Sequence, residues 1–258
     1  MDYETIALEV GDGVAVLTLD RPDKMNSMNG QMRAEITHAV REAGESARVI
    51  VITGRGRAFC TGQDLGDASS AAALDLERTL RDEYTPMIRA ITDCPVPTIA
   101  AVNGPAAGAG ASLALACDVV IASEDAYFLQ AFALIGLLPD AGSTWALPRA
   151  MGLPRAMGAA LFADRIGAQQ AADWGMIWEA VPAADFAESW AARAATLAKG
   201  PTRGYAAIKQ AMRASFANDL EAQLTLESQL QGQAGKTRDF REGVLAFLEK
   251  RKASFEGR

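Results

Sequence analysis

The stretch TIAAVNGPAAGAGASLA, residues 98–114, decides the fold class. Its first five residues are mostly apolar and β-branched or small, which is typical of a strand buried on both faces. A glycine-rich turn follows, and the small-residue run after the turn predicts the start of a helix. A buried strand that passes through a tight turn into a helix indicates an α/β protein with a largely buried sheet.

The same layout occurs once earlier, in VIVITGRGRAFCTGQDL at 49–65. Glycine permits tight turns and close approach of a ligand to the main chain, and helix N-termini leave backbone N–H groups free. Two such turns brought together would direct two N–H groups at one oxygen, as in an oxyanion hole. A second interpretation is that these glycines only permit close packing of helix on strand.

A dinucleotide-binding loop is a further alternative for the glycine turns. GAGASL at 108–113 has the first two glycines of the GxGxxG pattern, but Leu113 stands where Gly or Ala is needed. GRGRAF at 54–59 fails in the same way at Phe59. Both motifs also come late in the chain for a simple nucleotide-binding half, so a dinucleotide-binding loop is disfavoured. For either turn taken alone, close packing of helix on strand remains the simpler interpretation.

Hydrophobic periodicity assigns most of the remaining chain. Residues 5–19 predict a hairpin around a Gly-Asp-Gly turn, and 119–122 predict a buried strand. Gly200-Pro201 interrupts the pattern, so we expect an α/β core over residues 1–200 and a C-terminal helical region over 201–258. Helices are predicted over 28–44, 71–92, 154–163, 168–175, 183–199, 202–216, 218–233 and 239–250.

Composition excludes several classes of function. The chain has 258 residues and a formal net charge of −7, which disfavours general nucleic-acid binding. Its three cysteines form no CxxC motif, and its one histidine, His38, lies in a helical pattern, so a histidine-rich metal site is excluded. The N-terminal residues lack the apolar core of a signal peptide, and apolar runs are too short to span a bilayer. We expect a cytoplasmic protein that binds no membrane and no metal.

Five segments together resemble the crotonase superfamily, the enoyl-CoA hydratase/isomerase family. The resemblance covers nearly the whole chain and implies a spiral of ββα-like units with a helical C-terminal region used in trimer packing. It also implies a homo-trimer or dimer of trimers, an acyl-CoA thioester substrate, and no cofactor apart from the coenzyme A of that substrate. The segments are RPDKMNSMN (21–29), FCTGQDL (59–65), AAVNGPAAGAGASLALACDVVIAS (100–123), GLLPDAGSTWALPRAMG (136–152) and FREGVLAFLEKRKASFEGR (240–258).

The resemblance also implies roles for individual residues. The backbone N–H groups of Gln63 and Ala109 match the positions that bind the thioester oxygen and stabilise an enolate-like anion. Coenzyme A is expected to contact Lys24 and Met25, and also Phe247 and Lys250 reaching from a neighbouring subunit; the alternative for the basic run at 250–252 is a solvated helix end. The acyl pocket is expected to include Phe132 and Leu137.

The catalytic carboxylate is expected at Asp140, because the two positions that carry glutamates in hydratases of the family hold Ser112 and Phe132 here. Addition of water to a double bond needs a base and a proton donor, whereas a double-bond shift can use one base. Apolar neighbours would raise the pKa of Asp140, and a helix starting near Gly142 would lower it. The alternative is that Asp140 only caps that helix.

Within the family, PDAGSTWALPR (139–149), DWGMIWEAV (173–181) and the C-terminal tail resemble the ring-1,2-epoxyphenylacetyl-CoA isomerases of aerobic phenylacetate degradation. We therefore expect an acyl-CoA isomerase that shifts a double bond or opens a ring epoxide through an enolate-like intermediate. The alternatives are an enoyl-CoA hydratase of fatty-acid β-oxidation and a non-catalytic acyl-CoA-binding member. Cys60 is expected to pack in the core, and Asp64 to hold its loop by hydrogen bonding.

Overall fold

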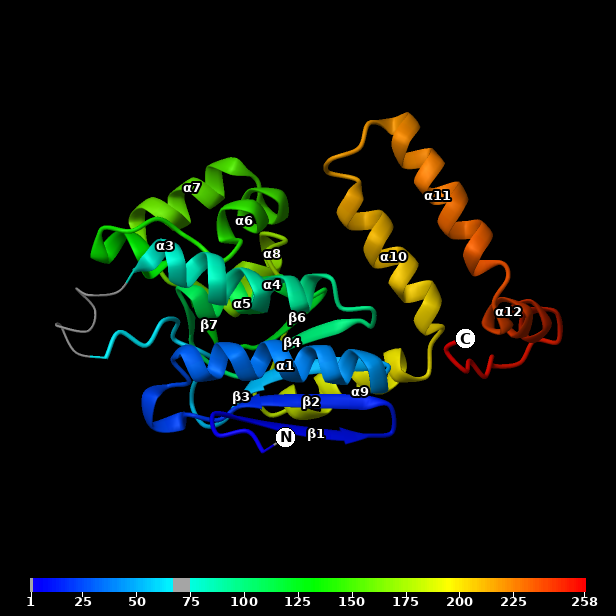
Figure 1. The fold of residues 1–258 in the computed structure, drawn as a ribbon, viewed down its shortest axis with the longest axis horizontal. Coiled ribbons are helices and arrows are strands. Elements are labelled where there is room, and N and C mark those ends of the chain that lie inside the picture. The colour runs from blue at the N-terminus through cyan, green and yellow to red at the C-terminus, as the bar shows by residue number, and fades with distance from the viewer. Residues whose placement is uncertain (1, 67–74) are drawn as a thin grey trace.

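A twisted six-stranded sheet forms the centre of the protein (Figure 1). The computed structural model describes residues 2–66 and 75–258. Strands β1 and β2 form the predicted antiparallel hairpin, and every other neighbouring pair in this sheet is parallel. In sheet order the strands are β1 (Ile6–Gly11), β2 (Val14–Leu19), β3 (Val49–Gly54), β4 (Thr98–Val102), β6 (Val119–Ser123) and β9 (Glu179–Val181).

Both faces of the sheet are covered by helices, which is why its central strands are apolar without alternation. On β3, Val49 and Val51 point toward α9 (Phe186–Ala198), while Ile50 and Ile52 face the larger core. Helices α1 (Gly30–Ser46) and α5 (Ala109–Ala116) contribute their buried side chains to that larger core. The α/β prediction is confirmed.

A second, three-stranded sheet lies beyond the carboxyl end of β4. It orders β5 (Ala106–Ala107), β7 (Tyr127–Leu129) and β8 (Ile166–Gly167). Strand β5 pairs with β7 in parallel and is bridged by Ala106 to Cys60 of the first glycine-rich loop. This small sheet therefore joins the two glycine-rich turns.

One nearly continuous helical segment walls the region beside these turns. It runs from α3 (Leu76–Thr79) through a π-helical turn (Leu80–Tyr84) into α4 (Thr85–Thr92). The helix predicted over 71–92 is confirmed from residue 76 onward, and residues 71–74 lie outside the described part. After β7 the chain forms a 3-10 turn (Ala131–Ile135), then α6 (Ser143–Met151), α7 (Leu153–Phe162) and, after β8, α8 (Ala168–Asp173).

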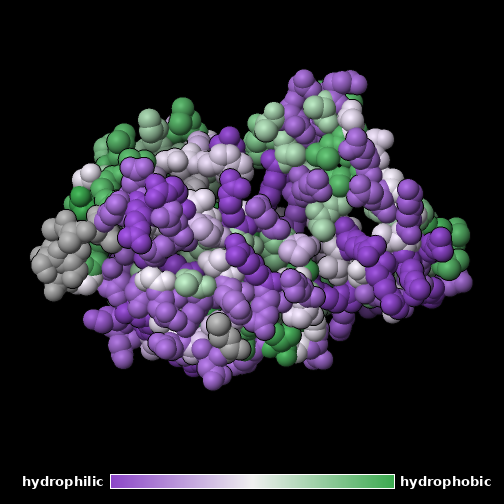
Figure 2. Space-filling view, viewed as in Figure 1, coloured by the Kyte–Doolittle hydropathy of each residue, from purple (hydrophilic) through white to green (hydrophobic). Residues whose placement is uncertain are grey.

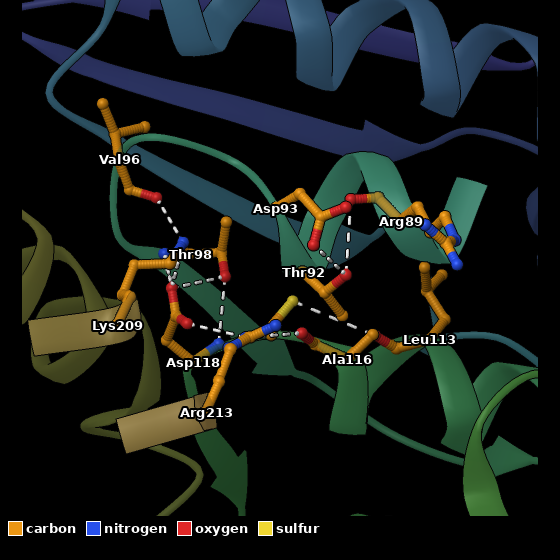
Figure 3. Close-up of polar contacts among 11 residues, drawn as sticks. Arg89, Thr92, Asp93, Val96, Thr98, Leu113, Ala116, Asp118, Lys209 and Arg213 are labelled. Carbon is orange, nitrogen blue, oxygen red and sulfur yellow. Dashed lines mark hydrogen bonds and ion pairs between the residues drawn. The ribbon is translucent and has the colours of Figure 1, made fainter. Parts of the chain in front are cut away.

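The C-terminal helices stand beside the core as a separate arm (Figure 1). The arm comprises α10 (Thr202–Ala214), α11 (Leu220–Ala234) and α12 (Arg238–Leu248), so the three predicted helices are confirmed. Asp118, which precedes β6, joins the arm to the core: its carboxylate lies 2.7 Å from Lys209 Nζ and 2.8 Å from Arg213 Nη2 (Figure 3).

Apolar side chains are exposed in two places. Figure 2 shows them over the α6–α7 region and on the C-terminal helices, whereas the face over α1 is largely hydrophilic. The exposed apolar side chains include Leu153, Met157, Leu161 and Phe162 of α7, and Met212, Leu224 and Phe247 of the arm. Surfaces of this kind commonly bind other subunits, and the homo-trimer stays a prediction. No helix in the described part of the chain is both long and apolar enough to cross a membrane.

Candidate active site

The two glycine-rich turns meet at one place. Gly62 has φ +95°, and a Cβ added there would lie 2.9 Å from the carbonyl oxygen of Ala107 and 3.3 Å from the nitrogen of Ala109. The N–H of Ala107 also donates to the carbonyl of Cys60 at 2.9 Å. The close approach therefore requires glycine at position 62, since a side chain would push the two turns apart.

Gln63 and Ala109 each present a backbone N–H at this junction. Ala109 is the first residue of α5, and Gly108 before it has φ +52° and makes no side-chain cap. Across residues 2–66 and 75–258, no hydrogen bond uses either N–H. The structure thus brings together the two donors predicted to form the oxyanion hole, and both residues line the same cavity.

That cavity has a volume of about 250 Å³ and walls that are mainly apolar. Phe132 and Leu137, which were expected in the acyl pocket, both line it. Tyr84 and Asp140 bring a hydroxyl and a carboxylate to the walls, and Asp140 is the only acidic residue among the described lining residues. The remaining walls come largely from Leu65, Leu76, Leu80, Ala131, Leu134 and Ile135.

Asp140 has an unsatisfied carboxylate. Its Oδ1 atom is buried and has no hydrogen-bond partner among the described residues. Burial raises the pKa of Asp140 from 3.8 to about 6, because the low-polarity surroundings disfavour the charged form. Desolvation by burial is the cause of this shift, and no side chain caps the helix that begins at Ser143. A carboxylate of this kind is able to exchange a proton near neutral pH.

The helix-cap alternative for Asp140 is wrong. The N-cap position of α6 is Gly142, and no side chain caps this helix. It is the backbone carbonyl of Asp140 that accepts from the N–H of Ser143, at 2.9 Å. Ala141 and Gly142 both have positive φ values, 48° and 91°, so the main chain bends sharply directly after Asp140.

Ser112 holds the Asp140 main chain in place. Its Oγ donates to the carbonyl of Asp140 at 3.0 Å and lies 2.7 Å from Oγ of Ser143. Both serines are buried. Ser112, at one of the two positions expected to carry a glutamate in hydratases, therefore holds the backbone of Asp140. Phe132, at the other position, contributes an aromatic side chain to the cavity wall.

Two residues of the site were not expected from sequence. The side-chain Oε1 of Gln63 accepts hydrogen bonds from Arg33 Nη1 at 2.7 Å and from the Tyr84 hydroxyl at 2.6 Å. Burial raises the pKa of Tyr84, which keeps its hydroxyl protonated as a donor. A sequence signal did exist at Arg33: it shares the buried face of α1 with Ile36 and Val40, where an apolar residue is usual.

The loop with the expected coenzyme A residues lies beside the first glycine-rich turn. The carbonyl of Met25 accepts from the N–H of Thr61 at 3.2 Å, and Lys24 next to it is exposed. Asp64 holds this arrangement through an ion pair of 2.8 Å with Arg21, whose hydrogen bond lowers the pKa of Asp64. Lys24 and Met25 are thus placed near the site, and their contact with coenzyme A stays a prediction.

Phe247 and Lys250 lie elsewhere, in and just after α12 of the arm. Neither residue lines the cavity, and Phe247 is 83% exposed. In Figure 1 the arm and α3 are at opposite ends of the molecule. A role for these two residues in coenzyme A binding would need a neighbouring subunit, as predicted.

The cysteine and the histidine considered for chemistry, Cys60 and His38, do not line the cavity. Cys60 is fully buried, and burial raises the pKa of its thiol to about 12, so it packs as a neutral side chain. His38 is exposed and lies 2.9 Å from the Tyr3 hydroxyl, away from the cavity. Within the described ranges, no three His, Cys, Asp or Glu residues gather as ligands for a metal ion.

Comparisons with known proteins agree with this geometry. Residues 9–258 match the enoyl-CoA hydratase/isomerase family model. A probable enoyl-CoA hydratase of Rhodobacter capsulatus is 59% identical over the full length of both chains, and the 1,2-epoxyphenylacetyl-CoA isomerase of Escherichia coli is 45% identical over 99% of each. A crystal structure of a putative enoyl-CoA hydratase/isomerase from Mycobacterium abscessus superposes with a TM-score of 0.93 at 36% identity, covering 98% of this chain and all of the other. The chain belongs to the enoyl-CoA hydratase/isomerase family and has the crotonase-like fold.

Proposed function

We propose that the protein is an acyl-CoA isomerase in which Asp140 is the single proton-transferring base. The observation that carries the proposal is the unpaired Asp140 carboxylate, the only acid among the described lining residues of a cavity that also holds two free backbone N–H groups. Positions 112 and 132 provide no second carboxylate to activate water or donate a proton.

The proposed reaction on a 3-enoyl-CoA balances with one base. Asp140 removes a proton from C2, the electron pair moves into the thioester carbonyl, and the N–H groups of Gln63 and Ala109 stabilise the resulting enolate oxygen. The protonated Asp140 then returns the proton to C4 as the double bond shifts to C2–C3. Aspartate begins and ends ionised, and the scheme uses no cofactor besides the coenzyme A of the substrate.

For the preferred substrate we propose the ring epoxide of phenylacetyl-CoA, whose C2 hydrogens lie between a thioester and an unsaturated ring. The 45% identity to the Escherichia coli 1,2-epoxyphenylacetyl-CoA isomerase supports this choice. The cavity of about 250 Å³ also favours a compact acyl group over a long chain.

Hydration is the second candidate, because the Rhodobacter capsulatus relative at 59% identity is named a probable enoyl-CoA hydratase. In that case Asp140 would activate water alone. The two reactions separate in a paired assay of the wild-type protein. One substrate is 3-hexenoyl-CoA, followed as it becomes conjugated, and the other is 2-hexenoyl-CoA, followed as it loses conjugation.

We expect isomerisation with a kcat/KM at least a hundred times that of hydration. Hydration that equals or exceeds isomerisation would replace the proposal by the second candidate. Absence of both activities and of any conversion of the ring epoxide, with tight binding of acyl-CoA, would indicate a non-catalytic member.

A further inference from the structure

Arg33 is a buried cation next to the active site that the proposed chemistry does not use directly. Its side chain is only 4% exposed. It belongs to α1, which is separate in sequence from the glycine-rich turns. A buried guanidinium is tolerated only where hydrogen bonds and a counter-charge replace water. Arg33 therefore has partners whose positions it constrains.

Four hydrogen bonds fix the guanidinium. Nε and Nη2 bind Glu83 Oε2 at 2.9 and 2.5 Å, and Nη1 binds the carbonyl of Met28 at 2.9 Å and Oε1 of Gln63 at 2.7 Å. The guanidinium also lies over the ring of Tyr84, 4.8 Å from its centroid. Arginine suits this role because its donors form a rigid planar fork.

Two of these hydrogen bonds hold groups next to the backbone of Gln63. Met28 forms a parallel bridge with Gln63: the N–H of Met28 donates to Gly62, and the carbonyl of Met28 accepts from the N–H of Asp64 at 3.0 Å. Arg33 holds that same carbonyl and also the Gln63 side chain. The peptide that carries the Gln63 N–H is thus bound to Met28 through the Gly62 carbonyl, and Arg33 binds both Met28 and the Gln63 side chain.

The helical wall of the cavity is also bound to the Arg33 guanidinium and its partner Gln63. Glu83 and Tyr84 belong to the π-helical turn, and the Tyr84 hydroxyl donates to the same Gln63 oxygen as Arg33. π-Helical turns inside α-helices occur frequently at functional sites. Arg33 consequently links the oxyanion loop to the helix that walls the acyl cavity.

We propose that Arg33 is a positioning residue that holds the Gln63 N–H in register with the Ala109 N–H, so that the thioester oxygen receives two hydrogen bonds. This inference rests on the proposed function only in taking these N–H groups as the oxyanion hole. It predicts an effect on kcat more than on KM, because a misplaced donor loses transition-state contacts first.

The test compares Arg33→Met and Arg33→Lys with the matched control Arg41→Met, which removes an exposed arginine from the same helix. With 3-hexenoyl-CoA, we expect Arg33→Met to lower kcat by ten- to a hundredfold with KM within threefold of wild type. Arg33→Lys should recover part of the loss, and Arg41→Met should match wild type.

An infrared measurement reads the hydrogen bonds without turnover. The probe is hexanoyl-CoA labelled with ¹³C at the thioester carbonyl, which cannot isomerise. Hydrogen bonding at the oxyanion hole lowers its carbonyl stretching frequency. We expect a downshift on binding to wild type, less than half of that downshift in Arg33→Met, and a full downshift in Arg41→Met.

If Arg33→Met does not fold, Gln63→Met tests the same link from the other side, because it keeps the backbone N–H and removes only the side-chain acceptor. We expect the same loss of kcat and of downshift. An unchanged downshift and kcat in the Arg33 or Gln63 variant, with a downshift in wild type, would overturn the role of Arg33 alone. No downshift in wild type would overturn the oxyanion assignment and the proposed function with it.

Discussion

Two aspartates, Asp118 and Asp140, are both largely enclosed and have opposite surroundings. Asp118 accepts from the N–H of Thr98 at 2.8 Å and forms ion pairs with Lys209 and Arg213 at the joint between core and arm (Figure 3). Asp140 has an oxygen with no partner among the described residues and lies among apolar side chains. One carboxylate is fully paired, and the other is left available.

This difference assigns Asp118 a structural role and Asp140 the role of the base in the proposed reaction. Breaking a buried ion pair leaves uncompensated charges and destabilises the fold, so the role of Asp118 should appear in the free energy of unfolding. An unpaired carboxylate in an apolar cavity destabilises the fold and has its pKa moved toward neutrality, where it can act as a base. Substitution of each aspartate should therefore affect a different property.

The largest effect is expected at Asp140. Asp140→Asn should lower kcat/KM for 3-hexenoyl-CoA by two to four orders of magnitude, since a positioned base contributes that much. Thermal denaturation and circular dichroism would show that the variant is folded. Retention of more than a tenth of wild-type activity would mean that another group transfers the proton.

The next effect is expected at Asp118. Asp118→Asn removes the charge opposite Lys209 and Arg213 and should lower the free energy of unfolding by about 3 kcal/mol, measured by urea denaturation. Isomerisation at 25 °C should stay within twofold of wild type. The matched control Asp125→Asn changes an exposed aspartate and should alter the free energy of unfolding by less than about 0.5 kcal/mol. A fall in activity without a fall in stability would contradict a structural role for Asp118.

The pH dependence of kcat/KM should differ in sign from the pH dependence of the contribution that Asp140 makes to the free energy of unfolding. With a pKa of about 6, Asp140 must be ionised to accept a proton, so kcat/KM should fall about tenfold per unit below that pH. Because this pKa is raised in the folded state, the folded protein binds more protons than the unfolded chain between about pH 4 and 6. The contribution of Asp140 to stability therefore becomes less favourable as pH rises through that range.

At pH 7 the wild-type protein should consequently be less stable than Asp140→Asn by about 1 to 2 kcal/mol, after allowance for partial solvent exposure. The difference should shrink toward pH 4. Urea denaturation of both proteins at pH 7 and pH 5 would measure it. A variant that is less stable than wild type at pH 7 would mean that the carboxylate is stabilised in a way the structure does not show.

The smallest effect is expected at His38. Its side chain is 47% exposed and contacts Tyr3 and Glu42 outside the cavity. His38→Gln should leave kcat/KM within twofold and the free energy of unfolding within about 0.5 kcal/mol of wild type. A tenfold loss of activity would show that the only histidine takes part in the reaction.

Sequence reasoning located most elements because their patterns are strong over several residues. The buried strands at 49–53 and 98–102 and the glycine turns after them follow from composition and length alone. The small sheet was missed because β5 and β8 have two residues each, too few to show any periodicity. Strand β5 pairs with β7 and is bridged to Cys60 of the first glycine turn, and β8 pairs with β7 from a distant part of the chain, so both depend on long-range pairing.

The chemical properties of the site were harder to predict from the sequence than the elements were, because they depend on contacts between residues far apart in the chain. The position of Asp140 was predictable, but the extent of its burial, which raises its pKa, and its lack of a hydrogen-bond partner among the described residues required the structure. The link from Gln63 to Arg33 and Tyr84 joins residues 30 and 21 positions apart in the chain, so no local motif contains it. The unusual arginine on the buried face of α1 was its only sequence signal.

The most direct test follows the proton itself. In a single turnover of 3-hexenoyl-CoA carrying two deuterium atoms at C2, in ordinary water, one base between C2 and C4 should deliver deuterium to C4 of part of the product. Mass spectrometry and deuterium NMR would locate the label. Deuterium at C4 with wild type, and no conversion on the same timescale with Asp140→Asn, is the predicted result. Product that carries no deuterium at C4 would contradict a single base that takes the proton from one carbon and returns it to the other.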